Sequence, residues 1–126
     1  MGKDQGSCGG HVVNISSTAG LVPTPLGPVY CACKHGVVGY TRSMGSDVHY
    51  QRTGVKVSAI CPSFVDTPMV RQIVQLSAVP EEAAKFMKSM QLMEPTYVAD
   101  ALVKLLQDGK NGAILKVTKT EGFQYV

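Results

Sequence analysis

The chain has 126 residues, of which 44% are hydrophobic and 17% are charged, and its formal net charge is +3. This length allows one domain at most. No apolar run approaches the roughly 20 residues that a membrane-spanning helix needs, so the sequence predicts no membrane span. The lysines are scattered and do not form a stripe with aromatic residues, and tryptophan is absent. This pattern argues against a surface that binds nucleic acid.

The four cysteines, Cys8, Cys31, Cys33 and Cys61, form no Cys-x-x-Cys pair and have no zinc-binding spacing with histidine. Cys61 ends an apolar run, and we expect it to be buried. The first ten residues are polar and unlike a cleaved signal peptide. We therefore expect reduced thiols in a cytoplasmic protein, with neither a disulfide framework nor a metal site.

The first predicted element is a short buried strand over residues 11–16, which follows two glycines. Residues 17–28 are rich in glycine, proline and threonine and predict a loop. A helix is predicted over 29–52, with Pro28 at its mouth, where a missing N–H is harmless. Gly54 is placed to end that helix in the left-handed conformation.

A second strand is predicted over 55–61 because the segment is rich in β-branched residues and lies between Gly54 and a proline. Beyond the loop 62–68, two shorter helical stretches are predicted near 69–77 and 81–92. Thr96 is predicted to cap a further helix, which Asp108-Gly109 ends, and residues 113–117 predict a third strand. The apolar residues of that helix recur with helical spacing: Val98, Ala101, Leu102, Leu105 and Leu106.

The resulting order is β-α-β-α-β, with connections long enough for parallel pairing. Right-handed crossovers would place the three strands side by side in sequence order. The predicted fold class is therefore α/β, an open, doubly wound sheet of Rossmann type.

Ligands of such sheets lie beyond the carboxyl ends of the strands. The residues predicted there are Ser16 and Ser17 after the first strand and the loop 62–67 after the second. Tyr30 and Lys34 are four residues apart at the start of the intervening helix, so they share a face. A phenol with an ordinary pKa near 10 is a poor base at neutral pH, and a neighbouring ammonium group favours the phenolate. This combination predicts proton removal from an alcohol.

By itself, Tyr-x-x-x-Lys is expected by chance in roughly one chain of this length in five. The alternative interpretation is an exposed tyrosine beside a solvated lysine. The pattern becomes specific through its surroundings, which are a strand that ends in Asn14-Ile-Ser-Ser17, the thirteen-residue offset from Ser17 to Tyr30, and a second strand followed by a Pro–Thr loop.

Three runs together carry a resemblance to the short-chain dehydrogenase/reductase family, and more narrowly to its members that oxidise prostaglandins with NAD: GGHVVNISSTAGLVPTPLGPVYCACKHGVVGYTRS, VKVSAICPSFVDT and NGAILKVTKTEG. The resemblance implies hydride transfer between a hydrophobic secondary alcohol, of hydroxy fatty acid or prostaglandin type, and NAD, with NADP not excluded. It also implies that Tyr30 is the base, that Lys34 favours its ionised form, and that Ser17 holds the substrate oxygen.

The same resemblance implies that Tyr30 and Lys34 contact the cofactor, together with Pro62, Val65 and Thr67 in the loop after the second strand. Phe64 would border the substrate. Thr67 has an alternative role as the N-cap of the next helix, ahead of Pro68, and the two roles are compatible.

The sequence departs from the family pattern in several places. Ser63 stands where a glycine is common, and it could crowd the cofactor or force a different turn. Gly27 stands where the prostaglandin-oxidising members have a glutamine. Gly6, Gly9 and Gly10 precede any strand and do not form the glycine-rich phosphate turn. We therefore expect residues 1–126 to be one partial domain, the catalytic half, without the dinucleotide-binding half and its relay asparagine.

Two alternatives remain open. In one, the enzyme is a sterol, retinoid or other carbonyl reductase of the same family. In the other, the chain is a non-catalytic interaction protein that pairs with a full-length relative. In either case the helix 29–52 offers a face for a homodimer or for such a pairing.

Overall fold

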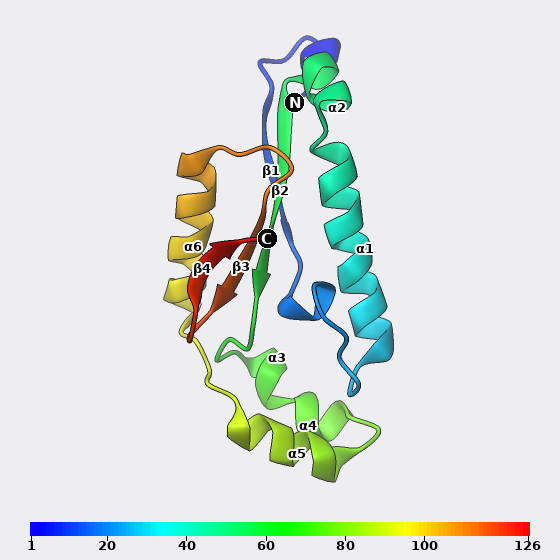
Figure 1. Ribbon diagram of the computed structural model, residues 1–126, viewed down its shortest axis with the longest axis vertical. Coiled ribbons are helices and arrows are strands. Elements are labelled where there is room, and N and C mark those ends of the chain that lie inside the picture. Colours follow the sequence, from blue (N-terminus) through cyan, green and yellow to red (C-terminus); the bar gives the residue numbers. More distant parts are fainter.

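The computed structural model describes all residues, 1–126, as a four-stranded sheet with helices on both faces (Figure 1). The strands are β1 (Gly10–Ile15), β2 (Val55–Pro62), β3 (Ile114–Thr118) and β4 (Gly122–Tyr125), and they lie in that order across the sheet. The first three are parallel, and β4 is antiparallel to β3. The predicted α/β fold class and the order of the three parallel strands are confirmed.

One long helix covers each face of the sheet (Figure 1). Helix α1 (Pro28–Met44) packs on one side, where Val38 meets Ala59, Cys61 and Ile114. Helix α6 (Pro95–Asp108) packs on the other side over a larger apolar cluster. That cluster comprises Ile60, Met93, Ala101, Leu105, Leu115 and Val117. None of the helices is long and apolar enough to span a membrane.

The prediction of one continuous helix over residues 29–52 is wrong. The helical segment is divided into α1 and α2 (Asp47–Thr53) at Gly45-Ser46. A Cβ at Gly45 would lie 2.2 Å from the Cα of Gly112, so the backbone of the helix end touches the turn before β3. This close approach breaks the helix, whereas Gly54 ends α2 with φ 64°, as predicted.

The segment after β2 folds into three short helices: α3 (Pro68–Arg71), α4 (Ile73–Leu76) and α5 (Pro80–Ser89). They lie beyond the carboxyl ends of the parallel strands (Figure 1). The predicted helix 69–77 is interrupted at Gln72, and the second helix begins one residue earlier than predicted and ends at Ser89. Thr96 does not cap α6, because Pro95 already occupies its first turn and Glu94 is the capping residue.

Strand β1 was predicted to be buried, and this prediction is wrong. It pairs only with β2, so its other edge is open, and Ile15 is 55% exposed while Val12 is 37% exposed. Strand β4 was not predicted at all. It begins at Gly122, where φ is 72°.

A hydrogen bond from the Tyr125 hydroxyl to Asp108 Oδ2 at 2.6 Å ties β4 to the end of α6. Burial, together with this bond, raises the pKa of Tyr125 from 10 to about 12. A raised pKa in the folded state means that the stabilisation is present below pH 10 and is lost as the pH rises towards 12. We expect Tyr125→Phe to lose less unfolding free energy over this range than the wild type does, in urea titrations at each pH. Equal losses in both proteins would contradict this.

Candidate active site

Tyr30 and Lys34 lie on successive turns at the start of α1, and the structure brings their side chains together. Lys34 Nζ is 5.5 Å from the centroid of the Tyr30 ring. Tyr30 is 47% exposed, and its hydroxyl makes no hydrogen bond with any residue. The phenol is therefore free to meet a ligand at the carboxyl edge of the sheet.

Both the side chain and the backbone of Lys34 are hydrogen-bonded to residues at the end of β1. Its Nζ donates to the carbonyl of Ile15 at 2.9 Å. Its own carbonyl accepts a hydrogen bond from Ser16 Oγ, also at 2.9 Å. The ammonium group thus stands between the strand end and the Tyr30 ring.

Ser17 lies two residues beyond the end of β1 and is the N-cap of the short 3-10 helix η2 (Thr18–Gly20). Its Oγ accepts a hydrogen bond from the Ala19 N–H at 3.2 Å and donates a long one to the Pro62 carbonyl at 3.4 Å. No hydrogen bond joins Ser17 to Tyr30. The structure therefore places Ser17 between the two strand ends, at the same edge of the sheet as Tyr30 and Lys34.

The loop after β2 is held by a one-residue parallel bridge between Val65 and Met93. Met93 N–H donates to Phe64 O at 2.9 Å, and Asp66 N–H donates to Met93 O at 2.8 Å. In such a bridge the N–H and C=O of Val65 itself point away from Met93. Neither group has a hydrogen-bond partner, so one donor and one acceptor remain together at this edge.

The geometry of this loop bears on the roles expected for Thr67 and Ser63. Thr67 occupies the N-cap position of α3, but its side chain makes no capping hydrogen bond. Ser63 was expected to crowd the cofactor or to force a different turn. No residue other than glycine has positive φ, so the turn at Ser63 needs no glycine conformation.

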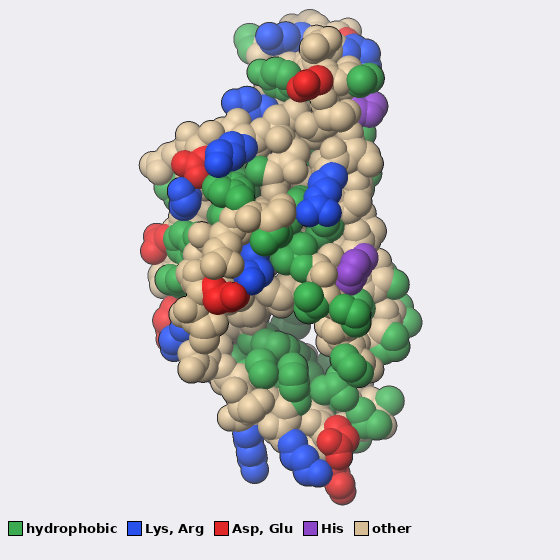
Figure 2. Space-filling model, in the orientation of Figure 1, with side chains coloured by type: hydrophobic (Ala, Val, Ile, Leu, Met, Phe, Trp, Pro, Cys, Tyr) green, Lys and Arg blue, Asp and Glu red, His purple; other side chains and the backbone are tan.

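Phe64 points towards the short helices and packs edge-on against Phe86 of α5, with ring centroids 5.5 Å apart. Phe86 in turn lines a pocket of about 410 Å³ between α5 and the loop that leads into α1. Its other lining residues are Thr24, Pro25, Leu26, Glu82 and Lys85. Figure 2 shows the surface hollowed between the sheet and these helices, with hydrophobic side chains around the hollow.

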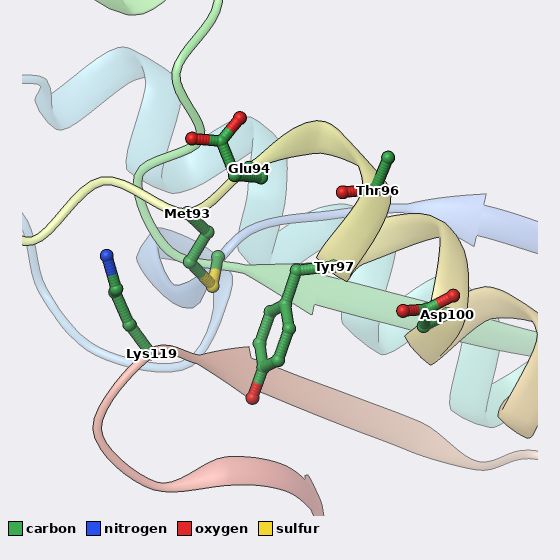
Figure 3. Close-up of a pocket in the computed structure, with 6 residues that line it drawn as sticks. All are labelled: Met93, Glu94, Thr96, Tyr97, Asp100 and Lys119. Atoms are coloured by element: carbon green, nitrogen blue, oxygen red, sulfur yellow. The ribbon is translucent and has the colours of Figure 1, made fainter.

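A second pocket, of about 290 Å³, lies at the start of α6 and contains none of the predicted site residues. Figure 3 shows Met93, Tyr97 and Lys119 on its walls. Lys119 Nζ donates to the Leu92 carbonyl at 3.1 Å, beside Met93. This pocket therefore adjoins the segment that bridges to Val65, and Tyr30 does not line it.

Cys61 is completely buried, as predicted, and no cysteine is paired in a disulfide. Burial raises the pKa of the Cys61 thiol, and the neighbouring Ser16 hydroxyl opposes part of this rise. The sequence placed Ser16 beside Ser17 at the ligand edge of the sheet but assigned it no role of its own. It did not single out Phe86.

The sequence model described as short chain dehydrogenase matches residues 4–78. The NAD(+)-dependent 15-hydroxyprostaglandin dehydrogenase of Mus musculus is 38% identical over 132 residues, which cover 99% of this chain and 49% of that protein. The chain thus spans about half the length of the curated relatives it matches.

Two solved structures have the same fold. Actinorhodin polyketide ketoreductase with NADPH has a TM-score of 0.70 at 32% identity, over 86% of this chain and 46% of that one. Levodione reductase has a TM-score of 0.67 at 32% identity, over 91% of this chain and 46% of that one. Together with the motif and the doubly wound sheet, these matches show that the chain belongs to the short-chain dehydrogenase family of oxidoreductases.

Proposed function

We propose that this chain is the catalytic half of a nicotinamide-dependent dehydrogenase that acts on a hydrophobic secondary alcohol. The observation that carries the proposal is the setting of Lys34, which is anchored to Ile15 and stands 5.5 Å from the ring of an exposed, unbonded Tyr30. An ammonium group in this place stabilises negative charge on a phenol oxygen.

In the proposed reaction, Ser17 donates a hydrogen bond to the oxygen of the alcohol. Tyr30 accepts the hydroxyl proton of that alcohol at its phenolate oxygen, and Lys34 stabilises the charge before the transfer. A bound nicotinamide dinucleotide supplies the hydride acceptor. The site is at the carboxyl edge of a parallel sheet, which is where such sheets bind their ligands. A substrate bound there would lie close to Ser17, Tyr30 and Lys34.

The free backbone groups of Val65 fit the nicotinamide carboxamide, since an amide offers both a donor and an acceptor in return. We propose that Val65 binds the carboxamide, with Pro62 and Thr67 beside it and with Tyr30 and Lys34 near the ribose. The mouse relative is named for NAD(+) and the ketoreductase was solved with NADPH. We propose NAD for this chain because of its similarity to the former.

For the substrate we propose a hydroxy fatty acid or prostaglandin, bound along Phe64 and in the adjoining pocket. The Phe64–Phe86 contact joins the loop at the catalytic edge to the wall of that pocket. An aromatic wall of this kind suits a long apolar chain. A sterol, retinoid or other carbonyl substrate would use the same surfaces.

We propose that residues 1–126 form one partial domain, and that the dinucleotide pyrophosphate is held by another half. The open edge of β1 supports this division. The backbone groups of His11 and Val13 that face away from β2 have no partners, and β1 carries no charged residue or proline to protect it.

A second candidate function is that of an interaction protein, and the outer face of α1 and α2 favours it. Val29 and Val48 are each 76% exposed and Tyr40 is 57% exposed, on helices that cover the sheet with their opposite face. We propose that this face contacts a second copy of the chain or a full-length relative.

The experiment that tests the dehydrogenase proposal joins this chain behind the amino-terminal half of a short-chain dehydrogenase relative in one polypeptide. We expect this fusion protein to reduce NAD when given a hydrophobic secondary alcohol. A fusion protein that folds and binds NAD but oxidises no such alcohol would contradict the proposal.

A further inference from the structure

Two hydrogen bonds join the carboxyl end of β1 to α1, and both involve Lys34. Ser16 Oγ donates to the Lys34 carbonyl, and Lys34 Nζ donates to the Ile15 carbonyl, each at 2.9 Å. Ile15, the last residue of β1, and Ser16, which follows it, therefore hold the side chain and the backbone of one helical residue. The next residue along the chain is Ser17.

The contact between Ser16 and Lys34 is closed to water. Ser16 is 3% exposed. A Cβ added to Gly20 would lie 2.5 Å from Ser16 Oγ and 2.6 Å from the Lys34 carbonyl oxygen. The turn η2 is thus packed against this hydrogen bond and shields it from solvent.

We propose that Ser16 is a positioning residue for the dehydrogenation proposed above, and this inference rests on that function. Its hydroxyl sets the position of α1 relative to β1 at Lys34. Tyr30 lies one turn earlier on the same helix, so the same bond also sets where the phenol stands relative to Ser17. Ser16 itself touches neither substrate nor cofactor.

Three variants and one control separate positioning from general stability. Ser16→Ala removes the donor, and Ser16→Cys restores a weak donor of similar size. Gly20→Ala places a methyl group against both atoms of the same hydrogen bond, Ser16 Oγ and the Lys34 carbonyl oxygen. The control is Thr41→Val, because Thr41 is also fully buried and its Oγ1 accepts a hydrogen bond from Asn14 of β1 at 2.9 Å, nearly two turns beyond Lys34.

The readout is the rate at which acetic anhydride acetylates Lys34 in the 126-residue chain, measured by mass spectrometry relative to the exposed Lys88. We expect Ser16→Ala and Gly20→Ala to raise this ratio roughly three- to tenfold, as the loss of one hydrogen bond allows. Ser16→Cys should recover part of the wild-type ratio. Thr41→Val should leave the ratio unchanged although it lowers the unfolding temperature.

Equal ratios in Ser16→Ala and wild type would overturn the proposal, as would equal increases in Ser16→Ala and Thr41→Val. In the fusion protein we expect Ser16→Ala to lower kcat with little change in KM. If the unmodified fusion protein oxidises no alcohol, the proposed function fails, whereas the acetylation ratios still decide whether Ser16 positions Lys34.

Discussion

Replacing Tyr30 by phenylalanine in the fusion protein is expected to lower kcat for alcohol oxidation by roughly 10²- to 10⁴-fold, the usual contribution of a positioned acid or base. The ring and its contact with Lys34 remain, and only the hydroxyl that accepts the proton is lost. Because Tyr30 is half exposed and its hydroxyl makes no hydrogen bond, the folded state should lose little stability. Steady-state rates of NAD reduction and a thermal unfolding curve measure the two effects.

Tyr40→Phe is the matched control for this experiment. Tyr40 is on the same helix, is 57% exposed and also makes no hydrogen bond through its hydroxyl. We expect its variant to keep the wild-type kcat. Retained oxidation in Tyr30→Phe would remove Tyr30 as the base, and an equal loss in both variants would point to damage of the helix surface.

The second large effect is expected in the core beneath α6. Leu105 is fully buried against the sheet, so Leu105→Ala removes apolar contacts and leaves a cavity. We expect it to lower the free energy of unfolding by about 2–5 kcal/mol. For a chain of this size such a loss is a large part of the total stability. Urea titration followed by circular dichroism measures it.

Leu106→Ala makes the same chemical change one residue further along, where the side chain is 46% exposed. We expect a loss below about 1 kcal/mol for this variant, since little apolar surface returns to water. If both variants lose the same amount of stability, α6 does not pack on the sheet through the face that carries Ala101 and Leu105.

The sequence predicted the elements that depend on local patterns. The apolar spacing from Val98 to Leu106 identified α6, and Gly54 and Gly109 both adopt the left-handed conformation that ends a helix. Strand β2 was predicted from its β-branched run between Gly54 and Pro62. These features depend on neighbours within one or two turns, which a sequence displays directly.

The features that the sequence did not predict depend on contacts between distant segments. Gly45 ends α1 because it meets Gly112, which lies 67 positions further along the chain. Strand β4 is short and is stabilised by pairing with β3 and by the bond from Tyr125 to Asp108. The exposure of β1 follows from its place at the edge of the sheet, and its apolar sequence alone suggests burial.

The candidate site also combines residues that could be predicted from local patterns with contacts that could not. Tyr30, Lys34 and Ser17 could be singled out from their spacing and from the strand before them. The hydrogen bond from Ser16 to Lys34 and the bridge between Val65 and Met93 could not, because each involves a backbone group whose partner is set by the fold. The pocket beside Phe86 also arises only when α5 meets the loop before α1.

We propose that these residues carry the catalytic groups of a dehydrogenase, while the pyrophosphate of the dinucleotide is bound by another half. The test is isothermal titration of NAD into the 126-residue chain, with the fusion protein as reference. We predict weak or undetectable binding to the chain alone and clear binding to the fusion protein. Micromolar affinity of residues 1–126 for NAD would show instead that this half holds the dinucleotide by itself.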